Sequence, residues 1–210
     1  VDLVSIELTT RMLATLFDFP FEDRRKLTYW SDVATTNINA GGPIDSYEKR
    51  NEVLQECLQY FTRLWEDRAS KPPTSDLISM LAHGPATKNM PAKEFLGNLV
   101  LLIVGGNDTT RNSMSASVLF LNQNPMEYQK LRENHNPIES MVPEVIRYHT
   151  PLSHMRRTAV QDAELGGKQI KKGDKVIMWY ISGNRDSDAI EHPDAFIIDR
   201  NRPRQHLSFG

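Results

Sequence analysis

A polar segment interrupts the most apolar stretch of the chain. Residues 105–110 are Gly-Gly-Asn-Asp-Thr-Thr and directly follow the apolar run 99–104. Glycine in a helix interior costs about 1 kcal/mol relative to alanine, and a buried acid needs a partner, so something must require these residues. The Thr109 hydroxyl can bond the carbonyl of Gly105, four residues back, and bend the helix there. The pattern predicts a groove that presents an acid, Asp108, beside a hydroxyl.

The same segment allows a purely structural interpretation. Glycines such as Gly105 and Gly106 are also typical of a point where two helices approach closely. In that case Asp108 would pair with a buried arginine. The spacing alone does not decide between a groove and a helix crossing.

Two further patterns carry polar chemistry. Glu144 and Arg147 are spaced i and i+3, so on one helix face they can form a bidentate pair. An exposed pair of this kind contributes less than about 1 kcal/mol and would have no further meaning. His206 opens the segment His-Leu-Ser-Phe-Gly, although in isolation it could be an ordinary surface histidine. His149 and His154 are five residues apart, which does not match the spacing of a metal-binding helix.

Composition excludes several classes of protein. The 210 residues carry a formal net charge of -2, which gives no basic excess for nucleic acid. The one cysteine, Cys57, excludes a disulfide framework and a multi-cysteine zinc site, and its helical spacing assigns it to core packing. The apolar run 99–104 is far shorter than the roughly 20 residues of a transmembrane helix. We expect a soluble protein of a reducing compartment, with no transmembrane segment.

Hydrophobic periodicity predicts the elements that position these residues. Apolar residues at helical spacing predict helices over residues 2–19, 22–34, 47–69, 76–83, 92–123, 127–134 and 140–148. Residues 96–104 are apolar on almost every face, so the long helix should run through the core. From Ala159 onward, short strand-like pieces are expected over residues 164–165, 169–170 and 176–180. We expect a mainly α chain with a small β region (α+β), helical over 1–158 and β-rich over 159–210, within one domain.

In this order, the three patterns together resemble the cytochrome P450 haem-thiolate monooxygenases over essentially the whole chain. Residues 105–110 resemble the oxygen-activating groove of that family's central helix, Glu144 and Arg147 its Glu-x-x-Arg pair, and residues 206–210 the start of its cysteine-ligand loop. The resemblance implies the P450 fold and haem b (iron protoporphyrin IX). The axial cysteine is expected after Gly210, so we expect an internal fragment of the fold, incomplete at both ends and inactive alone.

The resemblance also assigns roles around the oxygen site. It gives Thr109 the hydrogen bond to dioxygen, the co-substrate, and Asp108 the gating of proton entry through a nearby charged partner. Gly105 and Gly106 would leave room above the porphyrin. Electrons would come ultimately from NAD(P)H through a ferredoxin reductase and a ferredoxin.

Other roles concern the porphyrin and the substrate. Arg157 and His206 are expected to pair with the haem propionates, since an arginine fork binds a carboxylate bidentately, and Phe209 belongs to the same haem-binding segment. Four apolar residues are expected to line the substrate site, unless they simply pack in the core: Leu101, Leu102, Leu152 and Met155.

Three segments narrow the resemblance to one branch. The combination of residues 105–112, the His-Met-Arg-Arg-Thr of 154–158 and the Gln-His-Leu-Ser-Phe-Gly of 205–210 is most similar to the bacterial medium-chain alkane hydroxylases. This implies insertion of one oxygen atom of O2 into an unactivated C–H bond, as terminal hydroxylation of medium-chain alkanes or related aliphatic chains, in the bacterial cytoplasm. The alternatives are a fatty-acid or terpene hydroxylase of the same family and, more distantly, a cofactor-free helical interaction module.

One departure from the family affects the Glu–Arg pair. Many members have Pro-Glu-Arg-Phe where this chain has Pro-Asp-Ala-Phe at residues 193–196. Ala195 cannot complete the family's Glu–Arg–Arg network, and Arg200 is the candidate replacement.

Overall fold

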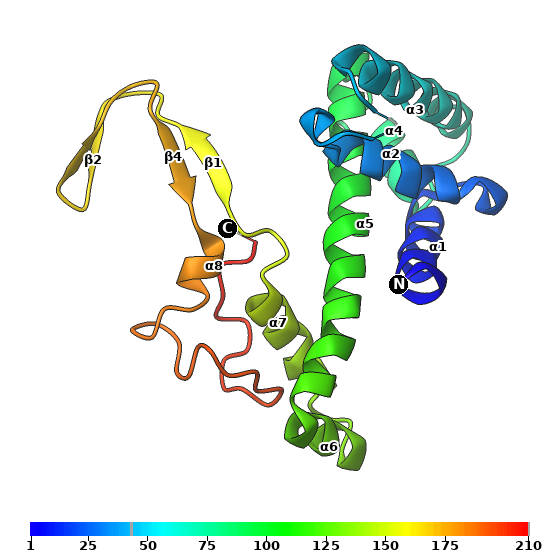
Figure 1. The fold of residues 1–210 in the computed structure, drawn as a ribbon. Coiled ribbons are helices and arrows are strands. Elements are labelled where there is room, and N and C mark those ends of the chain that lie inside the picture. The colour runs from blue at the N-terminus through cyan, green and yellow to red at the C-terminus, as the bar shows by residue number, and fades with distance from the viewer. Residues whose placement is uncertain (43, 210) are drawn as a thin grey trace. The chain divides into compact units, whose positions relative to one another are not determined.

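The computed structural model describes residues 1–42 and 44–209 and divides the chain into two compact units, Val1–Asn112 and Ser113–Gly210 (Figure 1). One long helix, α5 (Ala92–Gln123), passes from the first unit into the second. Each unit has its own cluster of buried apolar side chains. In the described part of the chain, no helix combines the length and the apolarity needed to cross a membrane.

The first unit consists of helices. A π-helical turn (Asp2–Ile6) and two 3-10 turns (Phe21–Asp23 and Ile38–Ala40) accompany α1 (Glu7–Phe17), α2 (Arg25–Thr35), α3 (Tyr47–Ala69), α4 (Leu77–His83) and the first part of α5. Capping side chains fix two of the helix starts: Ser46 accepts from the amide of Lys49, and Asp76 accepts from the amide of Ser79. The predicted helices 47–69 and 92–123 have the observed bounds.

Aromatic rings form the centre of the first unit. Phe17, Phe19, Trp30 and Phe61 are buried and pack with ring centroids 5.5–6.2 Å apart. Cys57 lies in the same cluster, and burial raises the pKa of its thiol to about 12. The thiol is therefore un-ionised at neutral pH and packs as a small apolar group, as the sequence predicted.

Helix α5 is buried along one face and exposed along the other. Its buried residues in the first unit are spaced by four and lie on one stripe: Phe95, Leu99, Ile103 and Asn107. Leu101 is 70% exposed and Leu102 37% exposed. The prediction that this stretch is buried all round is therefore wrong for the described residues, because the other helices of the unit cover one side of α5 and leave Leu101 and Leu102 exposed.

The second unit combines helices with two short antiparallel strand pairs. After the end of α5 it contains α6 (Pro125–Glu133), α7 (Ile138–His149), β1 (Met155–Thr158), β2 (Ala163–Leu165), β3 (Lys168–Ile170), β4 (Lys175–Met178) and α8 (Tyr180–Gly183). Strand β1 pairs with β4, and β2 pairs with β3. The core consists of Ala116, Phe120, Val145, Phe196 and Ile198.

Three predictions for this unit need correction. The β region begins with β1 at Met155, within the range predicted as helical, because β4 supplies a partner strand that the local sequence does not reveal. The predicted strand 176–180 ends at Met178, and the next residues turn into α8, where Tyr180 is buried. Helix α6 also begins two residues early, with Pro125 in its first turn, where a proline needs no amide hydrogen.

Candidate active site

The polar segment of α5 shows both of the geometries considered for it. The Thr109 hydroxyl donates to the carbonyl of Gly105 at 2.9 Å. A Cβ at Gly105 would meet no atom within 4 Å, so this side of the helix is open. A Cβ at Gly106 would lie 2.7 Å from the Leu13 side chain of α1. Gly105 thus borders open space, whereas Gly106 is the small residue that a helix crossing requires.

Asp108 has the charged partner that the sequence analysis anticipated. Arg111, one turn further along α5, forms an ion pair with Asp108 and a second one with Asp32 of α2, at 2.9 Å. All three side chains are partly exposed. Two carboxylates from different helices therefore share one guanidinium, and Arg111 can keep one partner when it releases the other.

Asn107 is a polar residue that the sequence analysis did not single out. Its side chain is fully buried, and its oxygen lies 3.1 Å from the hydroxyl of Thr9 on α1. The signal was present in the sequence, because position 107 continues the four-residue spacing of Phe95, Leu99 and Ile103. The contact joins α1 to α5 on the buried side of α5.

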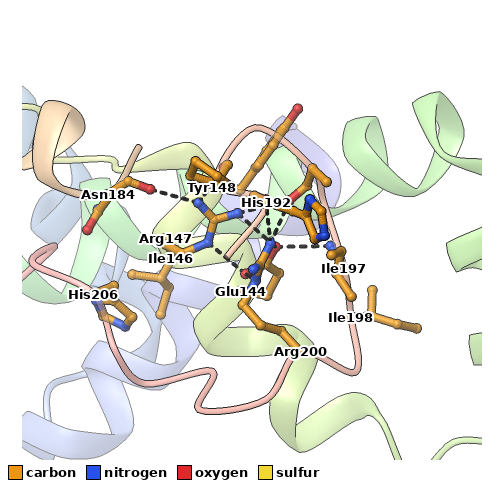
Figure 2. A network of polar contacts seen from close by, with 12 residues as sticks. Glu144, Ile146, Arg147, Tyr148, Asn184, His192, Ile197, Ile198, Arg200 and His206 are labelled. Atoms are coloured by element: carbon orange, nitrogen blue, oxygen red, sulfur yellow. Dashed lines mark hydrogen bonds and ion pairs between the residues drawn. The ribbon is translucent and has the colours of Figure 1, made fainter. Parts of the chain in front are cut away.

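Glu144 and Arg147 form a bidentate ion pair on α7, and both side chains are fully buried (Figure 2). Arg147 donates to the Glu144 carboxylate at 2.8 and 2.9 Å. Its remaining donors reach the main-chain carbonyls of Asn184 at 2.8 Å, Pro193 at 2.7 Å and Ala195 at 3.0 Å. The guanidinium thus fastens α7 to two later segments of the same unit.

Arg200 is the second arginine on Glu144. Its Nε donates to the carboxylate at 2.9 Å and its Nη2 at 3.3 Å, while the amide of Ile197 donates at 3.0 Å. The carbonyl of Ala195 accepts from both arginines, from Arg147 at 3.0 Å and from Arg200 at 2.9 Å. Arg200 therefore completes a Glu–Arg–Arg network without a basic side chain at position 195.

The predicted haem-contacting residues of the second unit are accessible. Arg157 on β1 is exposed and donates to the carbonyl of Arg156 at 3.2 Å. Alternation along a strand places Arg156 and Arg157 on opposite faces of β1. His206 is half-buried, and its Nδ1 accepts from the amide of Ser208 at 3.3 Å. Phe209 is 81% exposed, with its ring 5.4 Å from that of His206.

Electrostatics keep His206 neutral near pH 7. Burial, with a smaller contribution from the charge of Arg147, lowers the pKa of His206 below its ordinary value of 6.5. Because Nδ1 accepts a hydrogen bond, the neutral ring carries its proton on Nε2. His206 can therefore donate one hydrogen bond to an anionic group without becoming charged.

The four residues predicted to line a substrate site are all exposed. Leu101 and Leu102 lie on the open face of α5, and Leu152 and Met155 lie at the start of the β region. Core packing within the described residues therefore does not account for these four side chains.

Comparisons with known proteins agree with this assembly of motifs. The family model for cytochrome P450 matches residues 39–209. The chain is 36% identical over 215 residues to linalool 8-monooxygenase of Pseudomonas putida and 36% identical over 213 residues to steroid C26-monooxygenase of Mycolicibacterium smegmatis. All of this chain is covered, together with 51% and 48% of those two proteins, so the chain spans about half the length of the curated relatives.

A solved structure shows the same arrangement of elements. Cytochrome P450-153 from Novosphingobium aromaticivorans is 51% identical and has a TM-score of 0.86 to this chain, covering 100% of it and 50% of that protein. The match of the family model, the relatives and the fold leads to one conclusion: the chain belongs to the cytochrome P450 family.

Proposed function

We propose that the protein containing this chain is a haem-dependent monooxygenase that inserts one oxygen atom of O2 into an unactivated C–H bond of an apolar small molecule. The observation that carries the proposal is the hydrogen bond from the Thr109 hydroxyl to the Gly105 carbonyl, at a point where α5 borders open space. The preceding residue, Asp108, is ion-paired. In this proposal, residues 1–210 are part of a single P450 domain.

The described residues fit a haem group. Arg157 offers an exposed guanidinium and His206 a neutral Nε2–H, both of which suit the carboxylates of the propionates. Phe209 adds an exposed aromatic ring in the same segment as His206. When bound through a cysteine thiolate, haem supplies the binding of dioxygen and the cleavage of its O–O bond.

The α5 segment supplies protons to the open side of the helix. The Thr109 hydroxyl can turn from the Gly105 carbonyl toward that side and donate its proton there. Asp108 is a carboxylate while Arg111 holds it. Once Arg111 releases it, Asp108 can take a proton from water and pass that proton to the Thr109 oxygen, which returns Asp108 to the carboxylate form. Asp32 gives the released guanidinium a second carboxylate, so the release does not leave an unpaired charge.

The exposed leucines of α5 exclude water from the same side. Leu101 and Leu102 precede the polar segment by one turn and would contact an aliphatic chain. In the second unit, Leu152 and Met155 are proposed to contribute further apolar surface.

The proposed substrate is a medium-chain alkane or a related aliphatic chain, hydroxylated at its terminus. The motifs of residues 105–112, 154–158 and 205–210 support this specificity. A terpene is the second candidate, because one of the relatives is named for linalool. A ferredoxin, a ferredoxin reductase and NAD(P)H are the proposed source of electrons, and the cytoplasm is the proposed location.

Product analysis with the full-length protein tests the proposal. The reduced, carbon monoxide-treated protein should give the Soret band typical of thiolate-ligated haem. With ferredoxin, reductase and NAD(P)H, n-octane should yield 1-octanol more rapidly than linalool yields any product. Faster turnover of linalool would show that the substrate is a terpene and not an alkane. Absence of the thiolate band would contradict the haem monooxygenase itself.

A further inference from the structure

The side chain of Asn184 is fully buried in the second unit and is used on both of its polar atoms. Its amide nitrogen donates to the hydroxyl of Thr150 at 2.9 Å and to the hydroxyl of Ser208 at 2.9 Å. Its oxygen accepts from the amide of Leu207 at 2.7 Å. One side chain thus connects the end of α7, the end of α8 and the segment that contains His206.

The two hydroxyls explain why an amide is required at this position. Ser208 donates its hydroxyl proton to the carbonyl of Ile146 at 3.1 Å, and Thr150 donates its own to the carbonyl of Arg147 at 2.7 Å. Each hydroxyl has a single proton, so toward Asn184 both can only accept. A group with two N–H donors and one acceptor satisfies all three neighbours, whereas a carboxylate would lack both donors.

Two more contacts involve the main chain of Gly183 and Asn184. A Cβ at Gly183 would overlap the side chain of Leu207, so only glycine allows this close approach without a shift. The main-chain carbonyl of Asn184 accepts a hydrogen bond from Arg147 at 2.8 Å, drawn as a dashed line between the two residues in Figure 2. The Glu144–Arg147 pair therefore holds the main chain of Asn184, and the Asn184 side chain holds the segment 207–208.

We infer that Asn184 is a positioning residue that fixes the path of residues 206–209, through its bonds to Thr150, Leu207 and Ser208. It touches neither substrate nor reacting atoms. It determines where His206 is held and in which direction the chain continues beyond Ser208. The consequence for haem rests on the proposed function, whereas the positioning itself does not.

Asn184→Asp in the full-length protein tests the positioning, because it keeps the size and the acceptor and removes both donors. Amide hydrogen exchange of the peptide covering 205–209 should become about tenfold faster, since its side-chain anchors are lost. Exchange in residues 140–147 of α7 should stay unchanged. A merely structural defect would accelerate both segments together. Asn201→Asp, at an exposed asparagine of the same unit, is the matched control.

A second variant keeps the inference testable when Asn184→Asp does not fold. Ser208→Ala removes one hydroxyl, which accepts from Asn184 and donates to the carbonyl of Ile146. It should accelerate exchange of the same peptide by about threefold. Unchanged exchange in either variant, or equal acceleration in α7, would overturn the positioning role.

The haem spectrum separates this inference from the proposed function. Asn184→Asp should lower the fraction of carbon monoxide-bound haem with the thiolate-type band, relative to the parent protein. Local acceleration of exchange with an unchanged thiolate fraction would overturn the link to haem. A parent protein without that band would contradict the proposed function and leave the exchange result to decide the positioning.

Discussion

The polar regions around Asp108 and Glu144 differ in burial and in the number of partners that each charged group has. Around Asp108 on α5, charged side chains are partly exposed, and one arginine is shared between two carboxylates from different helices. Around Glu144 on α7, the Glu144–Arg147 pair is fully buried, and the carboxylate also accepts from Arg200 and from a main-chain amide. In the first arrangement Arg111 can release one carboxylate and keep the other. In the second, each arginine is held at once by the carboxylate and by main-chain carbonyls. Residue types alone do not distinguish them; burial and the number of partners do.

The largest effect is expected where the buried network loses its charge. Glu144→Gln leaves Arg147 and Arg200 buried without their carboxylate, which costs about 3–5 kcal/mol. The full-length variant should yield little haem-loaded protein, measured as haem per protein and by denaturant unfolding. Glu139→Gln, an exposed residue on the same helix, should behave like the parent. A Glu144→Gln protein that loads haem normally and loses only turnover would show that the network does chemistry.

Removing the second arginine should have a smaller effect. Arg200→Ala deletes two bonds to Glu144, but Arg147 still neutralises the carboxylate. We expect a loss of about 1–3 kcal/mol in the free energy of unfolding, typical of charged hydrogen bonds. Arg204→Ala, at an exposed arginine, serves as the comparison. Equal stability of the two variants would mean that Arg200 contributes nothing to the network.

On α5, substitution should change chemistry more than stability. Thr109→Ala removes the hydroxyl bonded to the Gly105 carbonyl while leaving the buried stripe intact. Substrate and haem binding should persist, and a larger share of the reducing equivalents should appear as peroxide instead of hydroxylated product. Thr110→Ala is the matched control. Unchanged coupling of electrons to product in Thr109→Ala would remove the proposed role of this hydroxyl.

Removing one carboxylate partner of Arg111 tests whether the shared ion pair takes part in proton supply. Asp32→Asn leaves Arg111 with Asp108 as its carboxylate partner, which should hold Asp108 more firmly. We expect product formation to slow a few-fold with stability nearly unchanged, because exposed ion pairs contribute at most about 1 kcal/mol. The solvent deuterium isotope effect on turnover should rise. An isotope effect equal to that of the parent protein would show that Asp32 has no role in proton supply.

Contacts that depend on helical spacing alone are predictable from the sequence. The Glu144–Arg147 pair and the Thr109–Gly105 bond depend only on helical spacing, and both are present. The partner of Glu144 at position 200 lies 56 residues away in the sequence, so spacing could only suggest it. The different settings of Gly105 and Gly106 depend on where Leu13 packs, which no local pattern reveals.

Tertiary pairing accounts for the misplaced elements. Strand β1 lacks an alternating pattern and exists because β4 lies beside it, with Met155 opposite Met178. The role of Asn184 likewise arises from three partners that lie 23 to 34 residues away along the chain. Long-range contacts of this kind are decided by packing of the whole unit and not by the neighbouring sequence.

The smallest expected effect is on the pH dependence of stability, and it comes from His206 and His149. Burial lowers the pKa values of His206 and His149 below 6.5 in the folded chain. The unfolded chain therefore binds protons that the folded chain excludes. The stability contributed by the neutral histidines is complete above about pH 6.5 and declines as the pH falls through that value toward the lower pKa of the folded state.

Unfolding of the haem-free full-length protein at a series of pH values measures this effect. His206→Gln should make the acid-side decline in stability shallower, and His135→Gln, at an exposed histidine, should not. If His206 pairs with a propionate, bound haem should stabilise its charged form and oppose the lowering of its pKa. The decline contributed by His206 should then shrink in the haem-loaded protein. The same pH slope in parent and His206→Gln would contradict the depressed pKa, and a His206 contribution unaffected by haem would argue against the propionate contact.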